Sequence, residues 1–385
     1  MSEVVIIGAS FAGIPIAHSL LKDIPSIKIT LINPSPTFYF TIAAPRILAK
    51  RDAFKSEQYL LPIEKEFSRY PKKSFKFIQG RASAIDVSAK TVSIDNNTRT
   101  IPFDYLVIAS GSTTASTIEK NATPIPFKQS GSNNMKTLIH NAQDRINTAQ
   151  NIVIGGAGPI GVELAGEIAE AARLAGRKVN ITLVSASYRI LPMLKPGGSM
   201  AAEKLLLAQG VNVLTSRKVT GAMQNPDSGK WTVTLDMDGN KLDADLYIPT
   251  TGVLPNNDFI PVEFLDENGW VVVDKELRVK GRSRSKSASL PIFAAGDITN
   301  NSMRLSFKAQ EQAAVLASNL KADIQGRGGK RKAYDQGDKI MMVVPVGSTG
   351  GTGLIFGWTP WSAMVKMVKG KDFLISKAQE AVAAK

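Results

Sequence analysis

Cysteine is absent from this chain of 385 residues, and its absence excludes several kinds of chemistry. Without thiols the protein can form neither a disulfide nor a redox-active dithiol, and it has no thiolate ligands for a metal ion. Histidine is nearly as scarce, because only His18 and His140 are present. We therefore expect no metal centre and no catalytic cysteine pair.

Long apolar runs and recognisable targeting signals are also missing. No stretch approaches the roughly 20 apolar residues that a membrane-spanning helix needs. The first apolar run begins at Val4, which leaves no room for a leader peptide, and Ser2 stands where N-myristoylation requires glycine. We expect a cytoplasmic protein. Peripheral attachment to a membrane or lipid droplet, and association with mitochondria, are left open.

The composition is that of a folded protein with a basic surface. Hydrophobic residues make up 43% of the chain and charged residues 21%, which argues against bulk disorder. The formal net charge of +14 favours anionic partners such as nucleotides, acidic lipids or acidic proteins. No zinc knuckle, helix-turn-helix or RNA-binding aromatic motif accompanies this charge, so specific nucleic-acid binding is not expected.

Two glycine-rich turns, each between an apolar strand and a helix of small residues, are the main positive feature. They are VVIIGASFAG at 4–13 and IVIGGAGPIG at 152–161. Such a turn aims free backbone N–H groups and the positive end of a helix at a pyrophosphate. The motif positions hold Gly8, Ser10 and Gly13 in the first turn, and Gly156, Gly158 and Gly161 in the second. Two turns in one chain predict a protein that binds two dinucleotides.

The first turn is predicted to hold a flavin nucleotide. The strand after its helix ends at Asn33, where such sites usually carry a ribose-binding carboxylate, and an amide can bond the same hydroxyl. Far along the chain, LPIFAAGD places Asp297 at a strand end, where a carboxylate can bond the ribityl chain. The segment IASG adds Ser110 and Gly111 to this site. The alternative is that Asp297 only caps the helix that follows.

The second turn is predicted to bind NAD(P)H. The strand after its helix ends at Ser185, where an acid would select NADH and repel a 2′-phosphate. The absence of that acid permits NADPH, and Arg189 is near enough in sequence to receive the phosphate. Glu163 has two interpretations. It contacts the nicotinamide end, or it is an ordinary first-turn acid that favours the helix dipole.

In their order along the chain, these motifs resemble those of the pyridine nucleotide-disulphide reductase superfamily. The motifs are GASFAG, YLVIASGS, IVIGGAGPIGVELAGEI, DLYIPTTGVLPNN and LPIFAAGD. The missing cysteines and the closing segments MRLSFKAQEQAAVLASNL and MMVVPVGSTGGTGLIFG are similar to the apoptosis-inducing-factor-like branch, which includes ferroptosis-suppressor-like proteins and their fungal relatives. The resemblance implies FAD, NAD(P)H, a quinone acceptor such as ubiquinone, and membrane association.

The resemblance also implies an α/β fold with two Rossmann-like dinucleotide-binding domains and a small α+β C-terminal domain. The expected FAD-binding domain comprises residues 1–114 and 254–325, the NAD(P)H-binding domain residues 115–253, and the C-terminal domain residues 326–385. Residues 112–134 are rich in Ser, Thr, Asn and Pro and are predicted to form a linker. The predicted cofactor contacts are completed by Arg46, Ala82 and Gly252.

The candidate catalytic residues are Glu163, Lys308 and Gln310. The last two lie on the helix that begins near Phe307, whose N-terminus the resemblance directs at the flavin carbonyl end; the alternative is a solvated helix start. Aromatic residues at 38–40 either line the flavin or pack in the core.

The C-terminal segment carries an apolar stripe at helical spacing with lysines beside it. The stripe consists of Trp361, Met364, Val365 and Val368, and the lysines are Lys366, Lys369 and Lys371. Such a stripe is a core or dimer contact, or a membrane-surface helix that feeds a lipid quinone. Monomer and homodimer are both left open.

The predicted function is that of an FAD-dependent NAD(P)H:quinone oxidoreductase. FAD would take a hydride from NAD(P)H and pass two electrons to a quinone. Three alternatives remain: a reductase of an acidic electron-carrier protein, a non-enzymatic FAD-containing signalling or nucleic-acid-binding protein, and a monooxygenase.

Overall fold

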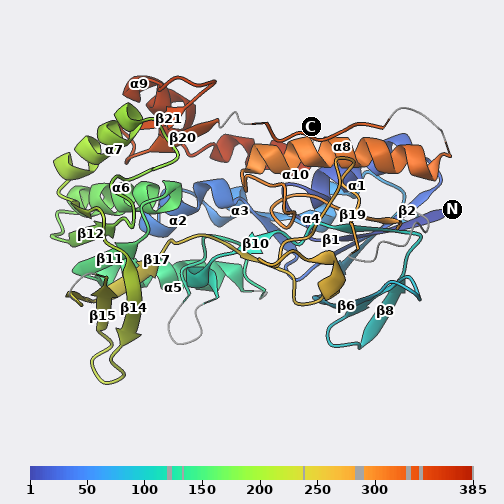
Figure 1. The fold of residues 1–385 in the computed structure, drawn as a ribbon, viewed down its shortest axis with the longest axis horizontal. Coiled ribbons are helices and arrows are strands. Elements are labelled where there is room, and N and C mark those ends of the chain that lie inside the picture. The colour runs from blue at the N-terminus through green and yellow to red at the C-terminus, as the bar shows by residue number, and fades with distance from the viewer. Residues whose placement is uncertain are drawn as a thin grey trace.

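The computed structural model describes residues 1–118, 124–131, 134–236, 239–281, 290–326, 331–337 and 341–383. Five parallel strands form the first sheet, in the order β19-β9-β1-β2-β5. They are β1 (Ser2–Ile7), β2 (Ile27–Asn33), β5 (Phe75–Gln79), β9 (Tyr105–Ile108) and β19 (Ile292–Ala294). The central strands are continuous runs of buried Val, Ile and Leu, as a parallel sheet covered on both faces requires. Helices α1 (Gly13–Asp23) and α8 (Ser306–Ile324) pack against each other beside it (Figure 1).

Four parallel strands form the second sheet, in the order β13-β12-β11-β17. They are β11 (Asn151–Gly155), β12 (Asn180–Val184), β13 (Asn212–Leu214) and β17 (Leu246–Pro249). Its helices are α5 (Met135–Thr148), α6 (Pro159–Leu174) and α7 (Pro196–Ala208). Figure 1 shows the two sheets at opposite ends of an elongated molecule. The predicted α/β class with two Rossmann-like units is confirmed.

The first sheet contains strands that precede the second sheet in the sequence and one strand that follows it. Strand β19 follows the whole second sheet along the chain, yet it pairs with β9 of the first sheet. Strands β10 (Ser112–Thr113) and β18 (Leu254–Pro255) pair antiparallel. The two chain crossings between the units therefore lie side by side. The domain boundaries given above stay a prediction.

Smaller elements complete the fold. Two antiparallel sheets comprise β6 (Ala82–Asp86), β7 (Thr91–Ile94) and β8 (Arg99–Pro102), and β14 (Val219–Gln224), β15 (Trp231–Leu235) and β16 (Lys241–Ala244). Two strand pairs are β3 (Thr37–Tyr39) with β4 (Leu60–Pro62), and β20 (Met342–Pro345) with β21 (Gly351–Leu354). The short helices are η1 (Thr41–Ala43), α2 (Ala44–Ala49), α3 (Ser56–Tyr59), α4 (Ile63–Glu66), η2 (Ala115–Thr117), η3 (Val262–Phe264), α9 (Ser362–Val365), η4 (Lys366–Gly370), η5 (Ile375–Lys377) and α10 (Ala378–Ala383).

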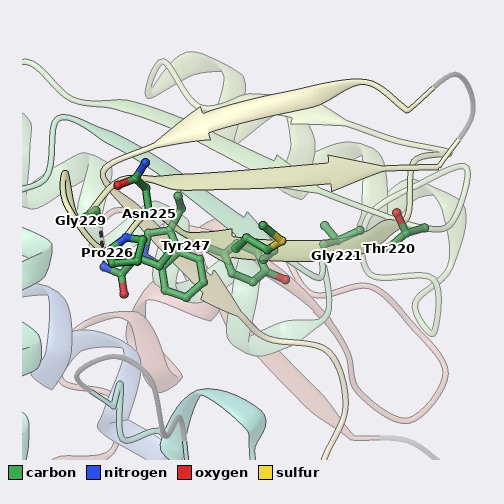
Figure 2. A pocket seen from close by; sticks show the side chains of 11 residues that line it. Thr220, Gly221, Asn225, Pro226, Gly229 and Tyr247 are labelled. Carbon is green, nitrogen blue, oxygen red and sulfur yellow. Dashed lines mark hydrogen bonds between the residues drawn. The ribbon is translucent and has the colours of Figure 1, made fainter.

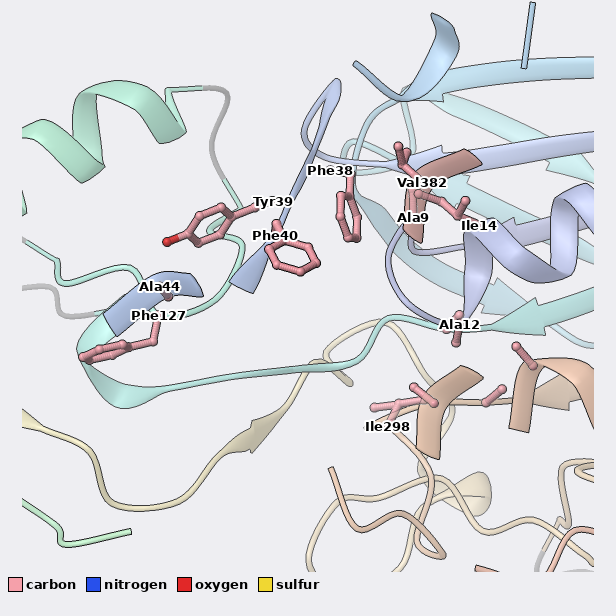
Figure 3. Packing of buried hydrophobic residues seen from close by; sticks show 14 of the residues in the cluster. Ala9, Ala12, Ile14, Phe38, Tyr39, Phe40, Ala44, Phe127, Ile298 and Val382 are labelled. Atoms are coloured by element: carbon pink, nitrogen blue, oxygen red, sulfur yellow. The ribbon is translucent and has the colours of Figure 1, made fainter. Parts of the chain in front are cut away.

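The aromatic residues at 38–40 pack in the core. Phe38, Tyr39 and Phe40 are all buried, and the ring of Phe11 meets that of Phe38 edge-on at 5.2 Å between centroids. Figure 3 shows this aromatic group beside the small residues of the first glycine turn, including Ala9 and Ala12. The aromatic side chains therefore support the backbone of that turn from one side.

The predicted linker is partly ordered structure, because its apolar residues find partners. Residues 119–123 and 132–133 lie outside the described residues, but β10 and η2 occupy its start. Phe127 is buried, and Tyr39 donates a hydrogen bond from its hydroxyl to the carbonyl of Pro126 at 3.2 Å. This part of the chain is packed onto the first unit.

The C-terminal amphipathic stripe is not one regular helical face. Helix α9 ends at Val365 and continues as the π-helical turn η4, which shifts the spacing of the side chains. Val365 is fully buried, whereas Trp361 is 81% exposed. The four residues of the predicted stripe are therefore divided between the core and the surface.

Candidate functional site

The two glycine turns have the same backbone construction. Gly8 donates its N–H to the carbonyl of Ile32 at 2.8 Å, and Gly156 donates to Val184 at 2.9 Å. Both glycines have positive φ, 105° and 117°, a region that L-residues with side chains rarely adopt. The second turn thus repeats the first.

Close packing explains the last glycine of each turn. A Cβ at Gly13 would overlap the carbonyl oxygen of Gly8, and a Cβ at Gly161 would overlap that of Gly156. A Cβ at Gly158 would meet no protein atom within 4 Å. The protein itself therefore does not require glycine at 158, whereas a ligand lying against the turn would.

Asn33 supports the first turn from within. Its Oδ1 accepts the N–H of Ala9 at 3.0 Å, and its Nδ2 donates to the carbonyl of Ser35 at 2.8 Å. The amide is buried and joins the end of β2 to the turn. Ser10 is exposed at the open side of the same turn. The predicted contacts of Ser10 and Asn33 with a nucleotide stay predictions.

Asp297 lies at the centre of a polar cluster beyond β19. Its Oδ2 accepts hydrogen bonds from Ser112 Oγ at 2.8 Å and from Lys128 Nζ at 2.6 Å. Burial opposes its ionisation, but Lys128, Ser112 and the charge of Arg304 hold the pKa of Asp297 below its ordinary value. Both of these bonds go to Oδ2, which leaves Oδ1 for a hydroxyl group.

Gln312 positions the backbone that carries Asp297. Its Oε1 accepts the N–H of Gly296 at 2.6 Å, and its Nε2 donates to Asn301 Oδ1 at 3.1 Å. Gln310, the residue predicted from the sequence, is exposed, and Lys308 pairs with Glu311 at 2.8 Å. The rotation of α8 in the fold therefore turns Gln312, and not Gln310, toward Gly296.

The remaining predicted cofactor contacts are found in four different surroundings. Ser110 donates from Oγ to the carbonyl of Asn256 at 2.8 Å, and Gly111 has a positive φ of 66° with open space beside it. Ala82 is buried in β6. Gly252 has a φ of 67° and is exposed near the start of β18. None of these positions conflicts with the predicted cofactor contacts, which stay predictions.

Arg189 carries two buried donors for which the described residues offer no acceptor. Ser185 Oγ donates to the carbonyl of Arg189 at 3.1 Å, so the two predicted residues lie together. The Nη2 of Arg189 donates to Pro192, but its Nε and Nη1 are buried without a partner among the described residues. Such donors usually have partners, and an anionic group on a bound ligand would supply them.

Glu163 contacts the C-terminal segment. Its Oε1 accepts a hydrogen bond from Lys369 Nζ at 2.6 Å, and both side chains are largely buried. Burial raises the pKa of Glu163 to about 7, against the opposing effect of Lys369. The carboxyl group can therefore hold a proton near neutral pH.

One turn further along α6, Glu167 joins three parts of the chain. Arg46 binds it through two parallel hydrogen bonds of 2.8 Å, and Arg46 Nη1 donates to the carbonyl of Lys371 at 2.8 Å. Lys50 pairs with Glu167 at 2.8 Å and also with Glu170. Arg46 thus holds α2 and the C-terminal segment against α6, and its predicted contact with a cofactor stays a prediction.

A separate hollow of about 830 Å³ lies beside the β14–β15 hairpin (Figure 2). Its lining includes Asn225, Pro226, Trp231 and Tyr247, and no charged side chain among the described residues. None of the predicted cofactor or catalytic residues lines it. It therefore does not suit a phosphate group, and we do not include it in the site.

The family model for pyridine nucleotide-disulphide oxidoreductases matches residues 2–313. The chain belongs to this family. A fungal relative, oxidoreductase ptaL of Pestalotiopsis fici, is 36% identical over 382 residues and covers 97% of both chains. Ferroptosis suppressor protein 1 of Xenopus laevis is 26% identical over 98% of this chain and 94% of its own. The predicted resemblance to the apoptosis-inducing-factor-like and ferroptosis-suppressor-like branch is confirmed.

Solved structures agree on the fold of this oxidoreductase. The sulfide:quinone oxidoreductase of Aquifex aeolicus matches with a TM-score of 0.77 and 19% identity, over 100% of this chain and 93% of that one. The protein is an oxidoreductase whose cofactors are FAD and NAD(P)H, as predicted. The open space at Gly158 and the two orphaned donors of Arg189 fit a bound dinucleotide. Within the described residues, no helix has the length and apolarity needed to cross a bilayer.

Two contributors to this site escaped the sequence interpretation. Lys128 lies in a segment whose composition indicated a linker, and Gln312 lies two residues beyond the predicted Gln310. The motif IPF before Lys128 was a usable signal, because an apolar run inside a polar segment indicates packing. No local pattern distinguishes Gln312 from Gln310.

Proposed function

We propose that the protein is an NAD(P)H:quinone oxidoreductase. When bound, FAD supplies the redox chemistry, because it accepts a hydride from NAD(P)H and passes two electrons to an acceptor. The chain itself binds both dinucleotides, orients them for hydride transfer, and supplies a group that can donate a proton to the acceptor. Its sequence contains no cysteine, so no protein dithiol takes up the electrons.

The observation that carries the proposal is the Glu163–Lys369 pair. Reduction of a quinone to a hydroquinone takes up two electrons and two protons. NAD(P)H supplies both electrons and one proton as a hydride, so the second proton comes from solvent. Glu163 lies in the first turns of the coenzyme helix α6, and its carboxyl oxygen can hold a proton near neutral pH. Lys369 keeps that carboxyl at the C-terminal segment.

The remaining residues of the site orient the two dinucleotides. The N-terminal ends of α1 and α6 direct backbone N–H groups at the two pyrophosphates. The hydrogen bonds that the described residues make to Asp297 go to Oδ2, so Oδ1 would accept a ribityl hydroxyl, while Gln312 binds the N–H of Gly296, the residue before Asp297. Arg189 would receive the 2′-phosphate of NADPH.

The relatives support a quinone acceptor without deciding it. One solved structure of the same fold is a sulfide:quinone oxidoreductase. Membrane quinones reside in lipid, so a peripheral attachment of the protein to a membrane belongs to the same proposal.

Anaerobic stopped-flow absorbance tests this function. NADPH or NADH should bleach the flavin band near ~450 nm, and a short-chain ubiquinone should restore it at a rate that supports turnover. Reduction by coenzyme with no reoxidation by any quinone would contradict the proposed acceptor. Flavin that neither coenzyme bleaches would contradict the reductase itself.

A second candidate acceptor is an acidic electron-carrier protein, which the net charge of +14 favours. That reaction would slow steeply as salt is added, because attraction between exposed charges is screened at physiological ionic strength. Reduction of a small neutral quinone would depend little on salt. The ionic-strength profile of steady-state turnover therefore separates the two acceptors.

A further inference from the structure

Several large apolar side chains of the C-terminal segment are exposed to solvent. We call Phe356, Trp358, Trp361, Met367 and Val368 the aromatic tip; all five are exposed, with Phe356 at 74% and Trp361 at 81%. The chain has four tryptophans, and two of them are here. Figure 1 shows α9 and the β20–β21 hairpin at an edge of the structure beside α7. An apolar group of this kind on a surface marks a contact with a partner or a membrane.

The aromatic tip is mounted on rigid structure. Ile355 and Trp358 exchange backbone hydrogen bonds of 2.9 and 3.1 Å across a two-residue turn. Both residues of the turn have positive φ, 47° at Phe356 and 85° at Gly357. Asparagine, aspartate or glycine is the usual choice at the first of these positions, and a phenylalanine there is conformationally unfavourable. The exposed ring is therefore retained against the preference of the turn.

The base of the aromatic tip is buried and hydrogen-bonded. Ser362 Oγ accepts the N–H of Gly351 at 3.0 Å, which joins α9 to β21. Val365 is fully buried beneath the exposed residues. Because the backbone beneath them is already fixed, binding through the exposed rings would cost little conformational entropy.

Two exposed lysines accompany the aromatic tip. Residues 341–372 contain three lysines and one acid, Asp372, which is half-buried and accepts the N–H of Leu374 at 2.9 Å. Lys366 and Lys371 are exposed, while Lys369 turns inward to Glu163. Tryptophan, phenylalanine and lysine together are the residues that lie at the boundary between lipid headgroups and acyl chains.

We propose that the aromatic tip is a docking surface for an anionic lipid bilayer, with Phe356, Trp358 and Trp361 entering the interface and Lys366 and Lys371 facing the acidic headgroups. The π-helical turn η4 presents Met367 and Val368 outward and directs Lys369 inward to Glu163. Lipid would thus lie next to the segment that reaches the coenzyme helix. The docking itself does not depend on which acceptor the protein reduces.

A second copy of this chain is a poorer occupant of the same surface. Symmetric pairing of two tips would bring Lys366 and Lys371 of both copies together, while the nearby acid Asp372 accepts the backbone N–H groups of its own chain. An anionic bilayer instead complements those charges.

Sedimentation with sucrose-loaded vesicles tests the docking, with no electron donor or acceptor present. The full-length holoprotein should bind phosphatidylcholine vesicles that contain about one third phosphatidylserine, and should bind pure phosphatidylcholine weakly. The intrinsic tryptophan fluorescence should shift to the blue on binding. The double substitution Trp358→Ser with Trp361→Ser should lower the partition coefficient about tenfold or more.

Matched substitutions provide the controls. Met367 is 76% exposed in the aromatic tip and Met223 is 77% exposed in β14, so Met367→Ser should weaken binding and Met223→Ser should not. Lys366→Gln with Lys371→Gln should reduce the preference for phosphatidylserine, whereas Lys72→Gln with Lys73→Gln should not. FAD content and the thermal unfolding midpoint of each variant show that it is folded.

Three outcomes would overturn the docking proposal. They are a wild-type protein that ignores phosphatidylserine vesicles, tip variants that bind as the wild type does, and tryptophan variants that turn a dimer into a monomer while vesicle binding is unchanged. The stopped-flow flavin assay tests the proposed function independently of vesicle binding. A docked protein that fails to reduce quinones would therefore refute the proposed function alone.

Discussion

Lys128 Nζ lies 2.6 Å from Oδ2 of Asp297, although the two residues are 169 positions apart in the sequence. The contact brings a lysine from a segment of loop composition to Asp297, which lies three residues beyond the end of β19 (Ile292–Ala294). Ser112 Oγ accepts from the same ammonium group at 2.9 Å, so the three side chains form a closed set. Lys128 is therefore the cation hydrogen-bonded to Asp297, and the charge of Arg304 acts on the carboxylate in the same direction.

Replacement of Lys128 by methionine should weaken the binding of FAD. Asp297 would lose its ion-pair partner, its pKa would rise, and its orientation toward a ribityl hydroxyl would be less defined. We expect the dissociation constant for FAD to increase about tenfold or more, measured by fluorescence titration of the apoprotein. Lys128→Arg should retain most of the affinity. Lys178→Met, on an exposed lysine, should bind FAD as the wild type does, and equal affinity in Lys128→Met would refute this role.

Two alanine substitutions in the second turn should have different consequences. Gly161→Ala places a Cβ against the carbonyl of Gly156 and should lower the thermal unfolding midpoint. Gly158→Ala meets no protein atom, so the fold and FAD content should be unchanged while NAD(P)H binds more weakly. Anaerobic titration with NADPH measures the affinity. A Gly158→Ala protein with wild-type coenzyme affinity would show that the pyrophosphate does not lie there.

Arg189 should determine the choice between the two coenzymes. Its Nε and Nη1 are buried without a partner in the described residues, and a 2′-phosphate would provide one. Arg189→Gln should therefore lower kcat/KM for NADPH about tenfold or more relative to that for NADH. Arg173→Gln, an exposed arginine at the end of α6, serves as the control. An unchanged ratio of the two kcat/KM values would exclude Arg189 from phosphate recognition.

Glu163 should make the stability of the protein fall as the pH rises toward neutrality. Its pKa is raised by burial to about 7 in the folded protein, so the folded state binds a proton more tightly than the unfolded state does between about pH 4.5 and 7. Across that window its contribution decreases with pH, by at most roughly 1.4 kcal/mol per unit. Glu163→Gln should remove this component.

Urea denaturation of both proteins between pH 5 and 8 would measure the difference. The free energy of unfolding of the wild type, minus that of Glu163→Gln, should decline as the pH increases. Lys369→Met removes the opposing charge and should extend the decline to higher pH. A difference that stays constant with pH would mean that Glu163 is already ionised throughout.

The glycine turns could be predicted from the sequence because their requirements are local. Gly8 and Gly156 need positive φ, and Gly13 and Gly161 need the absence of a Cβ, so residue type alone reports the geometry. The two parallel sheets followed from the same units, since an apolar strand, a glycine turn and a helix recur at 4–13 and 152–161.

The polar contacts of the site could not be predicted in the same way. Gln312 rather than Gln310 reaches Gly296, because the rotation of α8 is set by its packing against α1. Glu163 and Glu167 are spaced one helical turn apart, and the sequence indicates only that they share a face of α6. Their partners Lys369 and Arg46 come from the two distant ends of the chain, so no local pattern pairs them.

The Arg46–Glu167 pair limits how the two nucleotide-binding units can move. The exposed fractions of its side chains are 6% and 0%, and Arg46 also holds the carbonyl of Lys371. Swinging one unit away from the other would break this two-bonded ion pair and the hydrogen bond from Arg46 to the carbonyl of Lys371, so the contact resists opening at this seam. If this contact stays closed during turnover, coenzyme and acceptor reach the site from its edges while α2 and α6 stay joined.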